Sequence, residues 1–145
     1  MNAIRVKKLA PNAILPTYGS AGAAAADLYA CLEESVTIAP GETVFIPTGL
    51  SVEIPVGCAG LIYARSSMGA KRGLAPANKV GVIDSDYRGE IKVVLLNHSG
   101  TEQTVAPGER IAQMIITPVL TPAYEEVDEL TNTDRGTGGF GSTGK

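Results

Sequence analysis

The densest group of polar side chains in this sequence is the segment GVIDSDYRGE at residues 81–90, where an apolar strand pattern runs into two carboxylates, a tyrosine and an arginine. Asp84 and Asp86 are two residues apart, so on an extended chain their side chains point to one face. Such a pair can act as a general base or hold a divalent metal ion. The alternative is a turn with solvated aspartates, and the spacing by itself favours the turn.

A second segment, ARSSMGAKRG at residues 64–73, gathers hydroxyl and cationic side chains beside the possible start of a helical turn over residues 66–71. Ser66 is a suitable N-cap there. Free backbone N–H groups and the helix dipole at such a start favour an anion such as phosphate. An amphipathic surface turn is an equally open interpretation.

The last seven residues, GFGSTGK, match the GxxxxGK spacing of a phosphate-binding loop, but the Ser/Thr and the helix that should follow are missing. This excludes a P-loop NTPase. Bare glycine amides can still wrap phosphate oxygens, together with the side chains of Arg135, Ser142 and Thr143. Phe140, the lone aromatic residue among these glycines, is suited to stack on a flat ligand. A flexible terminus is the alternative.

Composition limits the scaffold that positions these segments. The chain has 145 residues, a net charge of −3, 44% hydrophobic and 19% charged residues, which is typical of one globular domain and argues against a protein that wraps nucleic acid. Two cysteines and one histidine are too few for a disulfide framework or a four-ligand zinc site. We find no signal peptide pattern and no apolar run long enough to span a membrane, so we expect a cytoplasmic protein.

The hydrophobic pattern predicts an all-β fold. Seventeen glycines and nine prolines disfavour long helices, and apolar residues alternate with a period of two in segment after segment. These alternating segments are separated by Pro40-Gly41, Pro55–Gly57 and Pro107-Gly108, which we expect to form hairpin turns or corners. The number of predicted strands suits a sandwich, a jelly roll or a small barrel. Nine strand candidates emerge: residues 4–6, 35–39, 43–46, 50–54, 59–64, 79–83, 90–97, 102–105 and 110–119.

Residues 91–96 are apolar on both strand faces, which predicts cover on both sides, the second cover being another subunit. We expect a β domain over residues 1–117, an acidic arm over 118–134 and a glycine-rich tail over 135–145. The tail has one aromatic and no aliphatic side chain, so it cannot bury enough surface to order itself.

In order along the chain, five segments resemble the five motifs of the homotrimeric deoxyuridine 5'-triphosphate nucleotidohydrolases (dUTPases). The resemblance covers essentially the whole chain, and the third and fifth motifs are the most specific. The matching segments are AAADLYA (24–30), ARSSMG (64–69), NKVGVIDSDYRGE (78–90), GERIAQ (108–113) and RGTGGFGSTG (135–144).

The resemblance implies a jelly-roll-like β-sandwich or distorted barrel that hydrolyses dUTP to dUMP and pyrophosphate, which keeps uracil out of DNA and supplies dUMP for dTMP synthesis. Asp84 would deprotonate the water that attacks the α-phosphorus, and Tyr87 would pack under the deoxyribose and exclude a 2′-hydroxyl. Asn78 and the backbone around Val82 and Ile83 would read the uracil edge. Lys92 would add a nucleoside contact.

For the phosphates, the resemblance implies contacts from Arg65, Ser66 and Gln113. Mg²⁺ would be held by the phosphates and water, with Asp27 in its outer shell. The tail would act as a lid: Phe140 would stack on the uracil, while Arg135, Gly141, Ser142 and Thr143 would close on the β- and γ-phosphates. Each site of the homotrimer would combine the third motif of one subunit, the second and fourth of another and the tail of a third.

The sequence departs from the family pattern at Ala25, Ala64, Ser67 and Met68, and Ser67 adds a hydroxyl near the phosphates. The segment Arg65–Ser67 is closer to the related deoxycytidine triphosphate deaminases. Ala70 and Val94, however, stand where those enzymes have an arginine and a catalytic glutamate. A non-catalytic nucleotide-binding protein is the rival from another class, and retention of Asp84 and Tyr87 argues against it.

Overall fold

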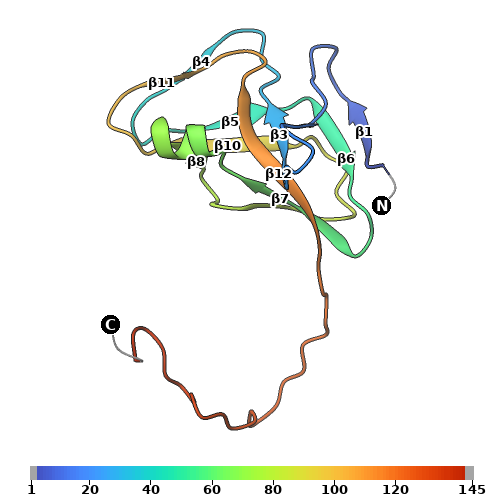
Figure 1. The fold of residues 1–145 in the computed structure, drawn as a ribbon, viewed down its shortest axis with the longest axis vertical. Coiled ribbons are helices and arrows are strands. Elements are labelled where there is room, and N and C mark those ends of the chain that lie inside the picture. Colours follow the sequence, from blue (N-terminus) through green and yellow to red (C-terminus); the bar gives the residue numbers. More distant parts are fainter. Residues whose placement is uncertain (1–2, 143–145) are drawn as a thin grey trace.

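The computed structural model describes residues 3–142, which form a jelly-roll-like β fold followed by an extended C-terminal segment (Figure 1). Twelve strands and one helical turn are present in this range, so the expected all-β class is confirmed. The elements are β1 (Arg5–Lys8), β2 (Thr17–Tyr18), β3 (Ala26–Tyr29), β4 (Val36–Ile38), β5 (Thr43–Pro47), β6 (Leu50–Glu53), β7 (Cys58–Tyr63), η1 (Ser67–Lys71), β8 (Leu74–Pro76), β9 (Gly81–Ile83), β10 (Lys92–Asn97), β11 (Gln103–Val105) and β12 (Arg110–Pro118).

The strands are arranged in two main sheets and two ribbons, all antiparallel. One sheet has the order β2-β3-β12-β7-β9 and the other the order β5-β10-β8, while β1 pairs with β6 and β4 with β11. Both sheets contribute to one buried apolar cluster, as shown by Leu28 of β3, Ile46 of β5 and Leu95 of β10. This shared core fixes the relative placement of the loops that carry the polar motifs.

Two of the expected turns are corners between sheets. Pro40-Gly41 lies between β4, which pairs with β11, and β5, which pairs with β10. Pro55–Gly57 lies between β6, which pairs with β1, and β7, which pairs with β12, so neither turn closes a hairpin. Gly41 and Gly57 have φ values of 77° and 82°, a left-handed conformation that suits glycine. The chain uses these corners to pass from one packed layer to the next.

Three strands of the structure, β2, β3 and β8, were not predicted from the sequence. β3 has only four residues and follows the alanines at 23–25, so its alternation is too short to stand out in the sequence. β2 has only two residues and β8 only three, and β8 ends in Pro76. Because β3 carries Asp27 and β8 leads toward the turn before β9, these omissions affect the scaffold of the site.

The helical turn lies where it was expected but differs in its start. It is a single π-type turn of five residues anchored by buried Met68. Ser66 stands at the N-cap position, as expected, but it makes no side-chain capping bond and its own backbone is helical. The N–H groups of Met68 and Gly69 both donate to the carbonyl of Arg65, at 3.1 and 2.9 Å. These two N–H groups are therefore not free for an anion.

The strand with two apolar faces is covered on one side only within this chain. Val93 and Leu95 of β10 are buried, whereas Val94 and Leu96 on the opposite face are half-buried. Phe45 of β5 lies opposite Val94 and is 65% exposed. The face that β5 and β10 present on this side is therefore apolar and open.

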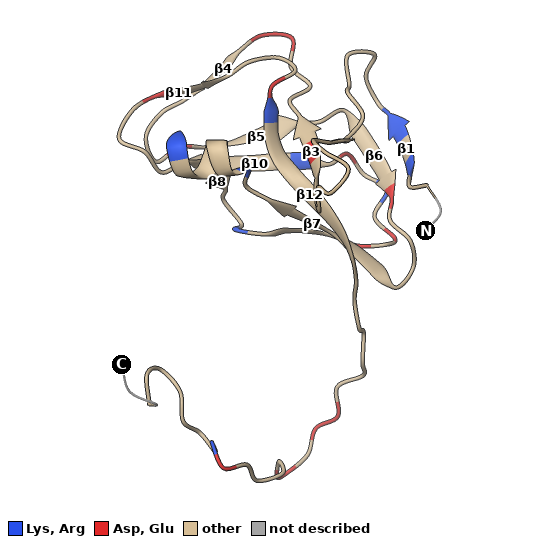
Figure 2. Ribbon diagram, in the orientation of Figure 1, with Lys and Arg blue, Asp and Glu red and all other residues tan. Residues whose placement is uncertain are grey.

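Beyond β12, residues 119–142 run away from the β body without a helix or strand (Figure 1). Tyr124 and Leu120 are 99% and 94% exposed, and acidic residues are spaced along residues 125–129 (Figure 2). Thr143 lies outside the described residues. Across residues 3–142, no helix combines the length and apolar character needed to cross a membrane.

Candidate active site

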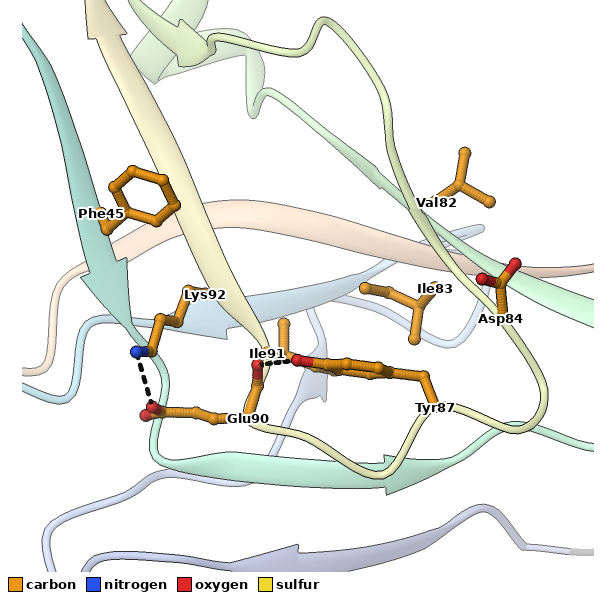
Figure 3. Close-up of a pocket in the computed structure, with 8 residues that line it drawn as sticks. All are labelled: Phe45, Val82, Ile83, Asp84, Tyr87, Glu90, Ile91 and Lys92. Atoms are coloured by element: carbon orange, nitrogen blue, oxygen red, sulfur yellow. Dashed lines mark hydrogen bonds and ion pairs between the residues drawn. The ribbon is translucent and has the colours of Figure 1, made fainter.

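A pocket of about 370 Å³ opens where β9 ends and β10 begins (Figure 3). It contains three polar residues of the third motif, Asp84, Tyr87 and Glu90, and one aromatic side chain from the neighbouring strand β5. The lining residues are Phe45, Val82, Ile83, Asp84, Tyr87, Glu90, Ile91 and Lys92.

Asp84 stands at the end of β9 and lines this pocket, whereas Asp86 does not. The chain turns between them: the N–H of Tyr87 donates to the carbonyl of Asp84 at 3.2 Å. Arg88 closes the turn, its Nη1 donating to the carbonyls of Ser85 (2.8 Å) and Tyr87 (2.9 Å). The expectation that the two aspartates share a face is wrong because the backbone is not extended here. Of the two aspartates only Asp84 lines the pocket, where its carboxylate suits a general base.

Tyr87 is held at the hydroxyl end of its ring. Its hydroxyl donates to the main-chain carbonyl of Glu90 at 2.9 Å. The ring crosses Gly89, where a Cβ atom would lie 2.5 Å from Tyr87 Cζ. With 43% of the residue exposed, the fixed ring offers a flat apolar surface to a ligand.

Glu90 and Phe45 are pocket residues that the sequence reasoning missed. Glu90 Oε1 accepts the N–H of Gly49 at 3.0 Å, and Oε2 lies 3.6 Å from Lys92 Nζ. The spacing of Glu90 and Lys92, two residues apart at the start of a strand, was the available signal, because it puts both on one face. Phe45 gave no comparable signal, since its neighbourhood depends on the pairing of β5 with β10.

Cys31 packs against the apolar core next to Gly49. Burial raises the pKa of its thiol, and the negative charges of Glu90 and Glu33 add to the effect. The thiol donates to Asn12 Oδ1 at 3.1 Å. A raised pKa keeps the sulfur protonated at neutral pH, so Cys31 is a poor nucleophile.

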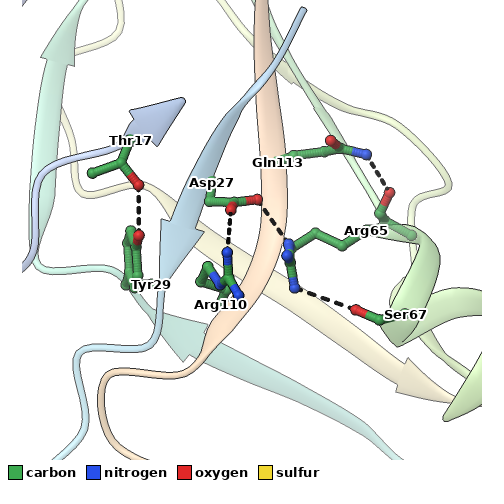
Figure 4. Close-up of polar contacts among 8 residues, drawn as sticks. Thr17, Asp27, Tyr29, Arg65, Ser67, Arg110 and Gln113 are labelled. Carbon is green, nitrogen blue, oxygen red and sulfur yellow. Dashed lines mark hydrogen bonds and ion pairs between the residues drawn. The ribbon is translucent and has the colours of Figure 1, made fainter. Parts of the chain in front are cut away.

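A separate polar cluster forms around Asp27 on β3 (Figure 4). Asp27 is buried, with Oδ1 accepting Arg65 Nε at 2.7 Å and Oδ2 accepting Arg110 Nη1 at 3.2 Å. Arg65 Nη1 also donates to Ser67 Oγ at 3.3 Å. One buried carboxylate thus orients two guanidinium groups, whose remaining N–H donors are suited to phosphate oxygens. The sequence reasoning did not include Arg110.

Strand pairing brings these residues together. Gln113 of β12 lies opposite Asp27 of β3 on one side and Tyr63 of β7 on the other. Gln113 Nε2 donates to the carbonyl of Ala64 at 2.9 Å. Beside the cluster runs a groove lined by Tyr63, Gln113, Ile115 and the alanines 23, 24, 25 and 64. The departures at Ala25 and Ala64 therefore line this groove.

The single chain does not unite all the predicted site residues. No residue lines both the Asp84 pocket and the groove beside Gln113. Asn78 is exposed and its amide lies against Gly81, next to the pocket but not in its lining. Phe140 is fully exposed in the C-terminal segment, where Arg135 Nε donates to the carbonyl of Gly138 at 2.8 Å.

Comparison with known proteins identifies one family. A sequence model of the dUTPase family matches residues 11–144. The chain is 49% identical to the deoxyuridine 5'-triphosphate nucleotidohydrolase of Desulfitobacterium hafniense, with 99% of each chain covered. It is 48% identical to the enzyme of the same name from Janthinobacterium sp., with 100% of this chain and 99% of the relative covered.

Solved structures give the same result. The dUTPase of Staphylococcus bacteriophage 80alpha with dUpNHpp superposes with a TM-score of 0.91, at 29% identity and full coverage of both chains. A point mutant of the dUTPase of phage phi11 of S. aureus, described as revealing the coordination of a structural Mg(II) ion, gives a TM-score of 0.82 at 25% identity, with 90% of this chain and 100% of the phage chain covered.

Proposed function

Because this chain belongs to the dUTPase family, we propose that the Asp84 pocket and the Asp27 cluster are two halves of an active site for dUTP. The chain is a dUTP diphosphatase, which hydrolyses dUTP to dUMP and pyrophosphate. The observation that carries the assignment of the site is the pocket in which Asp84 and the fixed ring of Tyr87 face the same space.

In the nucleoside half, Asp84 accepts a proton from the water that attacks the α-phosphorus. Tyr87 lies under the deoxyribose, where its ring leaves no room for a 2′-hydroxyl. The backbone at Val82 and Ile83, with the amide of Asn78, reads the uracil edge. Unpaired polar groups and steric clash then reject other nucleotides, and such polar rejection reaches about 10⁴–10⁵.

In the phosphate half, Arg65, Ser66 and Gln113 bind phosphate oxygens, and Ser67 supplies a further hydroxyl. Asp27 orients Arg65 and therefore the charge that Arg65 presents. Phosphoryl transfer depends mainly on positioning and on stabilisation of charge in the transition state. Each well-aimed donor contributes about 2.7–4 kcal/mol.

The donor set of the chain fits a magnesium ion carried by the substrate. Within residues 3–142, no three His, Cys, Asp or Glu side chains are grouped closely enough to hold a metal ion. Each Asp27 oxygen accepts one guanidinium N–H and keeps a lone pair, so Asp27 can accept from a metal-bound water. Mg²⁺ held by the triphosphate would neutralise phosphate charge as the leaving group departs.

The two halves share no lining residue, which supports a site assembled between copies of a cytoplasmic homotrimer. The open apolar face of β5 and β10 would lie in the subunit interface. Residues 1–117 would be the β body and residues 118–134 an arm that carries the tail to another copy. There Phe140 would stack on the uracil, and Arg135, Gly141, Ser142 and Thr143 would close on the β- and γ-phosphates as a lid.

The test is pyrophosphate release from dUTP, dCTP, dTTP and UTP in the presence of Mg²⁺, with ammonia measured in parallel. We expect release from dUTP alone. Ammonia from dCTP would indicate the deaminase branch. Absence of any reaction would favour a nucleotide-binding protein without catalysis.

A further inference from the structure

We propose that Glu90 is a positioning residue of this enzyme: it holds the ammonium group of Lys92 at the pocket and links it to the rigid turn at Gly49. This inference rests on the proposed function, because it concerns the nucleoside half of the same site. Glu90 acts through its neighbours: one carboxylate oxygen accepts the N–H of Gly49, and the other pairs with Lys92 (Figure 3).

Three contacts meet at Glu90. Its main-chain carbonyl accepts the hydroxyl of Tyr87 at 2.9 Å, its Oε1 accepts the N–H of Gly49 at 3.0 Å, and its Oε2 pairs with Lys92 Nζ at 3.6 Å. Tyr87, Glu90 and Lys92 all line the pocket that contains Asp84. One residue therefore connects two pocket side chains to the framework.

The Gly49 end of this connection is rigid. Gly49 has a φ of 66°, and a Cβ there would lie 2.7 Å from Cys31 Sγ and 2.8 Å from Ala13 Cβ. Its carbonyl accepts the N–H of Leu9 at 2.7 Å. The peptide is thus fixed by packing and hydrogen bonding, and its N–H has one direction in which to donate.

The neighbouring residues strengthen the same junction. Thr48 is completely buried, and its hydroxyl donates to the carbonyl of Ile91 at 2.6 Å. The N–H of Ile91 in turn donates to the carbonyl of Leu50 at 2.8 Å. The main chain next to Glu90 is therefore hydrogen bonded to the turn over residues 48–50.

Lys92 needs such a partner because half of its side chain is exposed and its four-carbon stem is flexible. Ordering a lysine costs side-chain entropy. An ion pair formed before the substrate arrives removes part of this cost from binding. We therefore expect Glu90 to act on substrate affinity more than on the chemical step.

A double-mutant cycle tests this role. Glu90→Gln retains an oxygen for Gly49 but loses the charge that faces Lys92, and Lys92→Met removes the ammonium group. We expect Glu90→Gln to raise KM for dUTP three- to tenfold while kcat stays within twofold. In the Lys92→Met background the same change should have less than a twofold effect on KM, because its partner is gone.

Glu102→Gln is the matched control, since Glu102 is exposed, directly precedes β11 and lines neither half of the site. It should leave kcat and KM unchanged. Melting temperatures of all variants separate loss of folding from loss of positioning. Additive effects of Glu90→Gln and Lys92→Met, or a fall in kcat at constant KM, would overturn the role of Glu90.

Titration calorimetry with dUpNHpp measures the same coupling without turnover. An inactive wild-type protein that still binds dUpNHpp with coupled Glu90 and Lys92 contradicts the proposed function but not this inference. An active wild-type protein with uncoupled variants contradicts the inference alone. Loss of both dUTP hydrolysis and dUpNHpp binding in the wild type overturns both.

Discussion

The hydroxyl of Tyr87 is hydrogen bonded to the main-chain carbonyl of Glu90 across the backbone of Gly89, at a distance of 2.9 Å. This contact closes a loop of four residues and fixes the plane of the aromatic ring. Because the anchor is a backbone carbonyl, the side chain at position 90 remains free to hold Gly49 and Lys92. Ring orientation and charge placement in the pocket therefore depend on the same short segment.

Gly89→Ala should displace the tyrosine, because its Cβ would lie 2.5 Å from Tyr87 Cζ. We expect kcat/KM for dUTP to fall about tenfold or more and the preference for dUTP over UTP to shrink, since the ring no longer excludes a 2′-hydroxyl. Gly100→Ala is the control, because no atom lies within 4 Å of a Cβ there. Unchanged selectivity in Gly89→Ala would show that the ring does not set sugar specificity.

Asp84→Asn should retain nucleotide binding while turnover falls by about 10²-fold or more, because the amide cannot accept the proton of the attacking water. Pyrophosphate release measures turnover, and calorimetry with dUpNHpp measures binding. Asp86→Asn is the matched control, since Asp86 does not line the pocket. Full activity of Asp84→Asn would remove this residue as the base.

Asp27→Asn should weaken the hold on two arginines at once. We expect KM for dUTP to rise tenfold or more, and the free energy of unfolding to fall by about 1.5–3 kcal/mol, because Arg65 and Arg110 lose a buried charged acceptor. Glu53→Gln removes the exposed Arg5–Glu53 ion pair instead and should change neither quantity by much. Equal effects of the two variants would contradict the orienting role of Asp27.

Deletion of residues 135–145 should abolish turnover without an appreciable change in melting temperature. Phe140 contributes nothing to the core because it is fully exposed, so the truncated β body keeps its buried cluster. Calorimetry with dUpNHpp should show weaker binding. A large drop in melting temperature would mean that the tail stabilises the fold.

The oligomeric state can be measured directly. Light scattering should give about three times the chain mass of 15.0 kDa. Substitution of Leu96, half-buried on the open face of β10, by Glu should lower both the mass and the activity. A monomer with full activity would contradict a site shared between subunits.

Local patterns were enough for the fold class. Alternating apolar residues and glycine-proline turns predicted most strands, because a half-buried strand leaves a periodic trace. β3 was missed because four residues after a run of alanines are too few to show that periodicity. Ser66 occupies the N-cap position without a capping bond, because the start of η1 is set by buried Met68 and by contacts to Arg65, which lie outside local propensity.

The sequence by itself determined the chemistry that is available, since the carboxylate of Asp84, the guanidinium of Arg65 and the aromatic ring of Phe140 follow from residue type and motif spacing. Tertiary structure decided which groups meet. Arg110 turns toward Asp27, and Glu90 reaches Gly49, across 83 and 41 residues of chain. Such contacts depend on strand pairing and on packing of the common core, which act between distant segments and leave no local signal along the chain.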